Sequence, residues 1–79
     1  MRYTVVLLPD RDEGGFVAYV PALPGCVTQG ETLDEGLAMA EDAINGYLEV
    51  LIERGEPIPI ETEGAVIATV EARVTAQVA

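Results

Sequence analysis

The sequence predicts a small α+β domain with the order β-β-β-α-β, in which an antiparallel sheet carries one long helix across one face. Three observations predict this class: two β-prone runs on either side of a polar turn, one strongly capped helix, and an alternating C-terminal segment. A chain of 79 residues has the length of one domain, so we expect a single domain over residues 1–79.

The first expected element is a β-hairpin. Residues 3–8 are mainly β-branched or aliphatic, and the run stops at Pro9. Residues 10–15 are mostly charged and end in two glycines, a composition typical of turns. Residues 16–20 are again β-prone, so the two runs are expected to pair as neighbouring antiparallel strands.

A short third strand is expected after a corner in the chain. Pro21 and Pro24 lack the backbone N–H that a central strand needs, and Gly25 favours a turn. Residues 26–29 are then expected to form the third strand, which Gly30 connects to the helix.

The helix has clear signals at both ends. Thr32 and Glu35 form a capping box, in which the Thr32 hydroxyl accepts from the Glu35 amide and the Glu35 carboxylate reaches back to Thr32. Arg54 suits the negative C-terminal end of the helix dipole, Gly55 favours a left-handed cap, and Pro57 prevents the helix from continuing. We therefore expect a helix from residue 33 to residue 54.

Two faces of this helix are of interest. Successive residues lie about 100° apart, which predicts a core-facing stripe of mostly large apolar residues: Leu33, Leu37, Ala40, Ile44, Tyr47, Leu48 and Leu51. One flank carries mostly small residues, which either cover the edge of the sheet or allow another chain to approach: Gly36, Met39, Ala43, Gly46 and Val50.

The C-terminal segment alternates over residues 66–78. Valine and alanine occupy every second position, and mainly polar residues lie between them. This period of two predicts a strand with one buried face. It is longer than an average strand of ~5–6 residues, so its far end, including Val74, is expected to lie against a second copy of the chain. The prediction is a homodimer or a higher oligomer.

Composition argues against several classes of function. The chain has no histidine, serine or lysine and a single cysteine, Cys26, so catalytic triads, zinc clusters, Schiff-base chemistry and internal disulfides are not expected. Cys26 is expected to be a small buried apolar residue. We therefore predict no enzyme, no catalytic or metal-binding residue and no cofactor.

Charge and hydropathy indicate where the protein acts. The formal net charge is −10, which disfavours direct binding to nucleic acid and suits a basic protein partner or simple solubility. No apolar run approaches the ~18 residues of a membrane span, and the N-terminal apolar run is too short for a secretion signal. A soluble, cytoplasmic protein without membrane contact is expected.

Residues 19–37, which run YVPALPGCVTQGETLDEGL, resemble the core signature of the HicB-type antitoxin family. Gly36 stands where this family usually has alanine, and Pro57-Ile-Pro59 resembles its proline stretch after the helix. The resemblance implies a truncated ribonuclease H-like domain that binds and inhibits a small basic HicA-type toxin, which cleaves mRNA. Many members add a C-terminal DNA-binding segment, whereas only one strand is expected here after Gly64.

Two functions are therefore considered. The first is an antitoxin-like module of a type II toxin–antitoxin system. The second is a stand-alone homo-oligomeric binding or scaffold domain with no toxin partner. Acidic residues in turns stay accessible once the helix has packed, and they are the predicted contacts to a basic toxin: Asp10, Asp12, Glu13 and Glu31.

Overall fold

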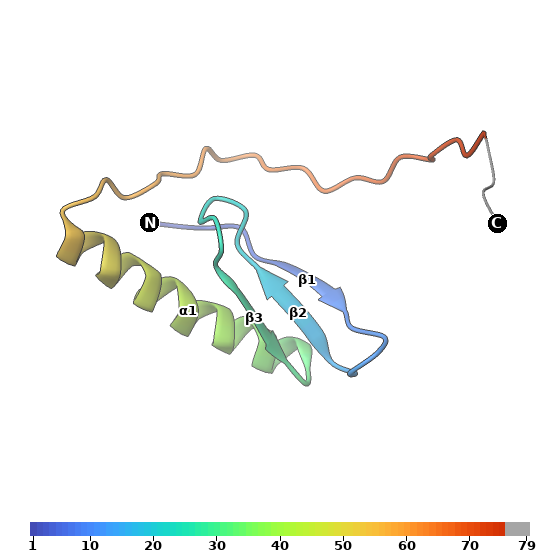
Figure 1. Cartoon of the computed structure of the whole chain (residues 1–79), viewed down its shortest axis with the longest axis horizontal. Coiled ribbons are helices and arrows are strands. Elements are labelled where there is room, and N and C mark those ends of the chain that lie inside the picture. The colour runs from blue at the N-terminus through green and yellow to red at the C-terminus, as the bar shows by residue number, and fades with distance from the viewer. Residues whose placement is uncertain (76–79) are drawn as a thin grey trace.

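The computed structural model describes residues 1–75 and contains three strands and one helix (Figure 1). Strand β1 spans Val6–Pro9, β2 spans Phe16–Tyr19, β3 spans Val27–Gly30, and helix α1 spans Leu33–Arg54. The sheet order is β1-β2-β3, and both strand pairs are antiparallel. The predicted class, the first four elements and their order are confirmed.

Strand β1 begins later than the sequence predicted. Val6 pairs with Tyr19 and Pro9 with Phe16, while the residues before Val6 lie outside the ladder. Tyr3 and Thr4 instead bond the segment that follows the helix: the Tyr3 hydroxyl donates to the Pro59 carbonyl, and Thr4 donates to Glu61. The N-terminal residues therefore attach the C-terminal part of the chain to the domain.

The helix ends follow the local signals closely. The Thr32 hydroxyl oxygen accepts from the Glu35 amide at 3.1 Å, as predicted. The Glu35 carboxylate, however, accepts from the amide of Glu31 at 3.0 Å, one residue earlier than the expected Thr32 amide. At the other end, Gly55 has a φ of 68° and its amide donates to the carbonyl of Ile52, so the left-handed cap is confirmed.

The hydrophobic core lies between α1 and one face of the sheet. Its buried members come from β2, from the corner after it and from the helix: Ala18, Val20, Leu23, Cys26 and Ala40. Half-buried helix residues pack against them, including Ile44, Tyr47 and Leu48 of the predicted stripe. Leu33 and Leu37, expected in the same stripe, are instead 53% and 48% exposed.

Two glycines explain this difference. A Cβ atom added at Gly30 would lie 2.4 Å from the backbone nitrogen of Gly36, and one added at Gly36 would lie 2.7 Å from Cδ2 of Leu7. The first turn of α1 therefore packs backbone against backbone on the end of β3. Because Gly36 and Ala40 point inward, Leu33 and Leu37 are turned away from the centre of the contact.

The predicted final strand is absent from residues 66–75. Residues 57–75 form neither helix nor strand, and Figure 1 shows this segment passing over the N-terminal residues and then running outward beyond β1. A segment becomes a strand only when its backbone pairs with a neighbour, and residues 66–75 have no backbone hydrogen-bond partner among the described residues. The remainder of the predicted strand lies outside the described residues. We call residues 65–75 the tail.

Candidate functional site

The sheet has an apolar face that the helix does not cover. Leu7 contacts Gly36 of the helix, so its neighbours Val6 and Leu8 point to the opposite face, because side chains alternate along a strand. The register adds residues from the other strands to this surface. We call it the outer face, and its apolar residues, beside the polar Gln29, are Val6, Leu8, Val17, Tyr19 and Val27.

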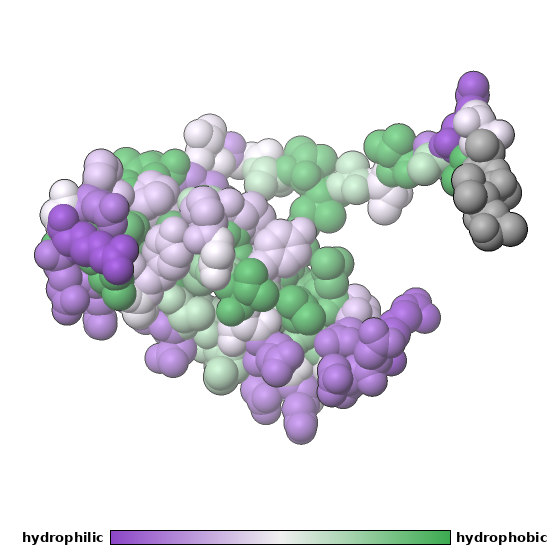
Figure 2. Space-filling model, in the orientation of Figure 1, coloured by the Kyte–Doolittle hydropathy of each residue, from purple (hydrophilic) through white to green (hydrophobic). Residues whose placement is uncertain are grey.

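Side chains on the outer face are accessible. Leu8 is 51% exposed and Val27 is 59% exposed, while Val6, Val17 and Tyr19 are half-buried. Figure 2 shows hydrophobic residues gathered over the middle of the molecule and along the tail. An uncovered apolar sheet face of this kind is typical of a surface that contacts another protein.

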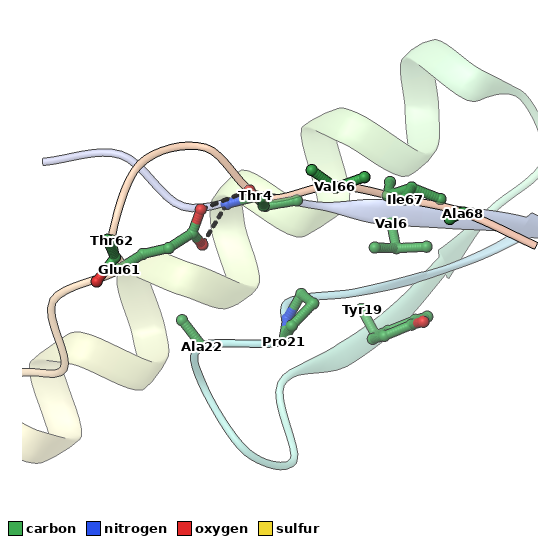
Figure 3. Close-up of a pocket in the computed structure, with 11 residues that line it drawn as sticks. Thr4, Val6, Tyr19, Pro21, Ala22, Glu61, Thr62, Val66, Ile67 and Ala68 are labelled. Carbon is green, nitrogen blue, oxygen red and sulfur yellow. Dashed lines mark hydrogen bonds between the residues drawn. The ribbon is translucent and has the colours of Figure 1, made fainter.

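A groove separates the outer face from the tail. It has a volume of about 600 Å³ and is lined on the domain side by Val6, Tyr19 and Pro21 (Figure 3). Residues 66–68 of the tail line the other side. Most of these side chains are apolar, so the groove extends the outer face towards the tail.

The start of the tail is held by Glu61. One carboxylate oxygen accepts from the backbone amide of Thr4 at 2.7 Å, and the other accepts from the Thr4 hydroxyl (Figure 3). These two hydrogen bonds lower the pKa of Glu61. The tail therefore leaves the domain from a fixed point beside β1.

The predicted toxin contacts lie together at one end of the sheet. Asp10, Asp12 and Glu13 belong to the turn between β1 and β2. A Cβ atom added at Gly15, at the end of this turn, would lie 3.0 Å from Cα of Glu31, which places Glu31 beside the turn. The structure therefore brings all four acidic residues to the same end of the sheet.

These four acids are not equivalent. Asp12, Glu13 and Glu31 are exposed, whereas Asp10 is half-buried. The Asp10 carboxylate accepts from the amides of Asp12 at 3.0 Å and Glu13 at 3.1 Å, an arrangement that builds the turn. Asp10 therefore shapes the loop, and the other three present their charges to solvent.

The predicted self-association flank of the helix is divided between the interior and the surface. Gly36 is buried against Leu7, and Ala43 is half-buried against the core. Met39, Gly46 and Val50 are exposed. The lack of a side chain at Gly36 is explained by packing within the chain, and a contact between copies through the exposed members stays a prediction.

Val74, the remaining predicted contact between copies, lies on the tail and not on the helix flank. It is 70% exposed, and Val70 is 92% exposed. Large apolar residues therefore continue along the tail without cover from the described part of the chain.

The outer face was not predicted from the sequence. Residues 3–8 and 16–20 are apolar at nearly every position, and this pattern does not say which side chains point towards the helix. The available signal was the excess of apolar residues over what one helix can cover. A hairpin that is apolar on both faces is expected to be covered on both, by other elements of the chain or by another protein.

The Cys26 thiol is buried within the described part of the chain. Burial raises the pKa of the Cys26 thiol, which disfavours its reactive thiolate form. No three histidine, cysteine, aspartate or glutamate side chains within residues 1–75 lie close enough to share a metal ion. No helix in this described part has the length and apolar character needed to cross a membrane.

Comparisons with known proteins agree on one family. The family model of HicB-like antitoxins of bacterial toxin–antitoxin systems matches residues 3–75. A UPF0150 protein of Thermoplasma acidophilum is 49% identical over 59 residues, covering 75% of this chain and 84% of that protein. Antitoxin HicB 1 of Photorhabdus laumondii is 43% identical over 60 residues, which cover 76% of this chain and only 38% of that antitoxin.

A solved structure has the same fold. The N-terminal domain of the Burkholderia pseudomallei antitoxin HicB superposes with a TM-score of 0.70 at 31% identity. The similarity covers 81% of this chain and 74% of that domain. The three strands and the long helix match this domain, while the ribonuclease H-like description stays a prediction.

Proposed function

The chain belongs to the HicB-like antitoxin family of bacterial toxin–antitoxin systems, and from this we propose that it binds and inhibits a small basic mRNA-cleaving toxin of the HicA type. The observation that carries the proposal is the family match, which spans residues 3–75. The proposed role is that of a non-catalytic inhibitor that acts in the cytoplasm by covering its partner.

The surface of the domain suits a basic partner. The outer face offers apolar area for a contact, and the turn with Asp12 and Glu13 lies at one end of the same sheet, beside Glu31. Buried apolar contacts supply most of the affinity of a protein interface, whereas charges at its rim mainly raise the association rate. The net charge of −10 adds a long-range attraction to a basic toxin and repels phosphate backbones.

The proposal is tested by searching beside the gene of this protein for a small basic reading frame of the HicA type and purifying its product. Purified toxin is mixed with the full chain, and binding and cleavage of mRNA are measured. We expect a stable complex and loss of cleavage at equimolar protein. Full toxin activity in the presence of a large excess of the folded chain would exclude the antitoxin role.

The surface is tested with a charge variant and a matched control. The variant Asp12→Asn, Glu13→Gln, Glu31→Gln is expected to slow association at low salt by about tenfold, because the steering charges are lost. The control Asp42→Asn, Glu49→Gln, Glu53→Gln removes the same charge from exposed helix positions. It is expected to change the association rate much less. If both variants slow association equally, the toxin does not bind preferentially at the end of the sheet that carries Asp12, Glu13 and Glu31.

A stand-alone homo-oligomeric domain is the second candidate. The observation that favours it is the exposed apolar tail, in which Val70 and Val74 have no cover within the described residues. This candidate predicts that the purified chain forms a stable oligomer. It also predicts that no small basic reading frame of toxin size lies next to the gene. The presence and binding of such a toxin would instead favour the first candidate.

A further inference from the structure

The sequence of residues 66–78, which includes most of the tail, is nearly symmetric about Ala72. Positions at equal distances before and after Ala72 carry the same residue type at four of six steps, and an opposite charge pair at another. Residues 66–78 run VIATVEARVTAQV, so the matched pairs are Val70 with Val74, Thr69 with Thr75, Ala68 with Ala76, and Val66 with Val78, and the charged pair is Glu71 with Arg73. The one mismatch is Ile67 with Gln77.

We propose that two copies of this chain associate by antiparallel pairing of their tails about a two-fold axis at Ala72. In this register, Ala72 lies opposite Ala72 of the second copy, and Glu71 lies opposite the second copy's Arg73. By symmetry, Arg73 lies opposite the second copy's Glu71. Two-fold dimers are the commonest symmetric assembly, and a two-fold interface requires this kind of self-complementarity.

The register also sorts the side chains correctly. Because residues on one strand alternate between faces and opposed residues share a face, Val70 meets Val74 of the second copy and Ala72 meets Ala72 on one face of residues 69–75. The other face then carries two Glu–Arg pairs and two Thr–Thr pairs. Opposite charges and paired threonines are favourable cross-strand neighbours, whereas like charges directly opposite each other are not.

Residues 69–75 contain the three innermost pairs and Ala72, and the structure describes all of them. Val70 and Val74 are exposed, and the backbone of residues 66–75 has no hydrogen-bond partner among the described residues. In Figure 1 this part of the chain extends beyond the three-stranded sheet. A second copy can therefore pair with it without breaking any contact of the domain.

The domain also supports the start of such a ribbon. The Glu61–Thr4 hydrogen bonds fix where the tail begins, and residues 66–68 already line the groove beside the outer face. An isolated two-stranded ribbon is only marginally stable in water. Contact with this groove supplies additional apolar burial and holds each tail near an extended conformation before it pairs.

The symmetry of the sequence argues for a second copy as the occupant. An unrelated partner places no requirement that the residues before and after Ala72 match each other. Pairing with a second copy places each residue before Ala72 opposite one after it, so the matched or oppositely charged residues at five of the six steps suit this occupant, and the opposite charges at positions 71 and 73 prevent like charges from meeting.

A charge-exchange experiment tests the proposal on the full chain alone, without any toxin. Arg73→Glu places Glu opposite Glu twice in the dimer, and Glu71→Arg places Arg opposite Arg twice. We expect either change to weaken dimerisation about tenfold or more, measured by sedimentation equilibrium. The double variant Glu71→Arg, Arg73→Glu restores both opposite pairs and is expected to dimerise like the unchanged chain.

Mixing the two single variants gives a second readout. One chain then carries two arginines and the other two glutamates at positions 71 and 73, so a mixed dimer contains only opposite pairs. We expect the mixture to form mixed dimers more readily than either variant forms its own. Additive weakening in the double variant, or no preference for mixed dimers, would overturn the proposed register.

Cysteine cross-linking measures the register directly, in a Cys26→Ala background. Residues opposed in an antiparallel pair have Cα atoms about 4.5–5.5 Å apart, within the range of a disulfide. Ala72→Cys is therefore expected to form a disulfide-linked dimer under mild oxidation. Val70→Cys is the control, since its own copies lie about 13 Å apart along the ribbon at ~3.3 Å per residue. It should cross-link only when mixed with Val74→Cys.

Circular dichroism checks that each variant retains its helix. Efficient self-linking of Val70→Cys, or a monomer at high micromolar concentration for the unchanged chain, would overturn the proposal. Because these measurements need no second protein, their failure would leave the antitoxin role untouched, and failure of the antitoxin role would leave the dimer untouched.

Discussion

The close approach of Gly30 to Gly36 makes a quantitative prediction about the domain. In Gly30→Ala, the new Cβ atom would lie 2.4 Å from the backbone nitrogen of Gly36 and 2.8 Å from the carbonyl carbon of Glu35. Both contacts are with backbone, so no flexible side chain can move aside. The φ angle of Gly30 is not positive, so alanine introduces no strain in the backbone of this residue and the cost comes from space alone.

Overfilling a packed contact costs typically ~1–3 kcal/mol, and we expect Gly30→Ala to reach about 3 kcal/mol because the helix must move off the sheet. For a domain of this size, 1 kcal/mol corresponds to roughly 4–8 °C in melting temperature, so the expected decrease is about 12–24 °C. Thermal and urea unfolding, followed by the helix signal at one fixed protein concentration, measure it. The fixed concentration matters because self-association would raise the apparent stability.

Gly46→Ala is the matched control. It introduces the same methyl group at an exposed position of α1, where no atom beyond the nearby backbone of the helix itself lies within 4 Å of the added Cβ. Alanine is about 1 kcal/mol more favourable than glycine inside a helix, so Gly46→Ala is expected to raise the stability. Gly30→Ala with unchanged stability would refute the inferred backbone contact, and a loss of stability in Gly46→Ala would show that its flank is covered.

Three further predictions concern single side chains. Leu23 is fully buried, so Leu23→Ala is expected to lower the free energy of unfolding by about 2–5 kcal/mol in urea, and a smaller loss would mean that the core closes over the cavity. The Thr4 hydrogen bonds lower the pKa of Glu61, so they stabilise the fold at pH values above the ordinary glutamate pKa, and this contribution is lost as the pH falls through the folded-state pKa. Thr4→Val and Glu61→Gln are each expected to make the free energy of unfolding less dependent on pH in this acid range. Cys26 is buried with a raised pKa, so a thiol reagent should modify it slowly in the native protein and rapidly in urea, and equal rates would contradict its burial.

Features set by neighbouring residues were predictable from the sequence. The cap at Thr32, the end at Gly55 and the helix between them depend on hydrogen bonds within a few residues, and they match the structure. The hairpin and the third strand follow from composition and turn residues, although β1 is shorter than predicted. In each case the signal and the interaction lie close together in the chain.

Features set by distant contacts were not predictable in the same way. The inward position of Gly36 depends on Gly30 and Leu7, which belong to other elements, so the apolar pattern of the helix wrongly placed Leu33 and Leu37 in the core. The bond from the Glu31 amide to Glu35 reflects how the chain enters the helix after β3. The outer face needed the strand register, which fixes which side of the sheet each residue occupies.

The tail shows why a correct pattern can still lead to a wrong element. Its alternation predicts a strand with one buried face, yet residues 66–75 remain unpaired and exposed in the single chain. A period of two reports that a face is to be buried, and it does not report which chain supplies the cover. The near symmetry of residues 66–78 about Ala72 is the basis of our proposal that a second copy supplies this cover. On this view the strand exists only in the dimer, and shortening the chain at residue 65 should abolish self-association while leaving the helix signal and the Glu61–Thr4 contact in place.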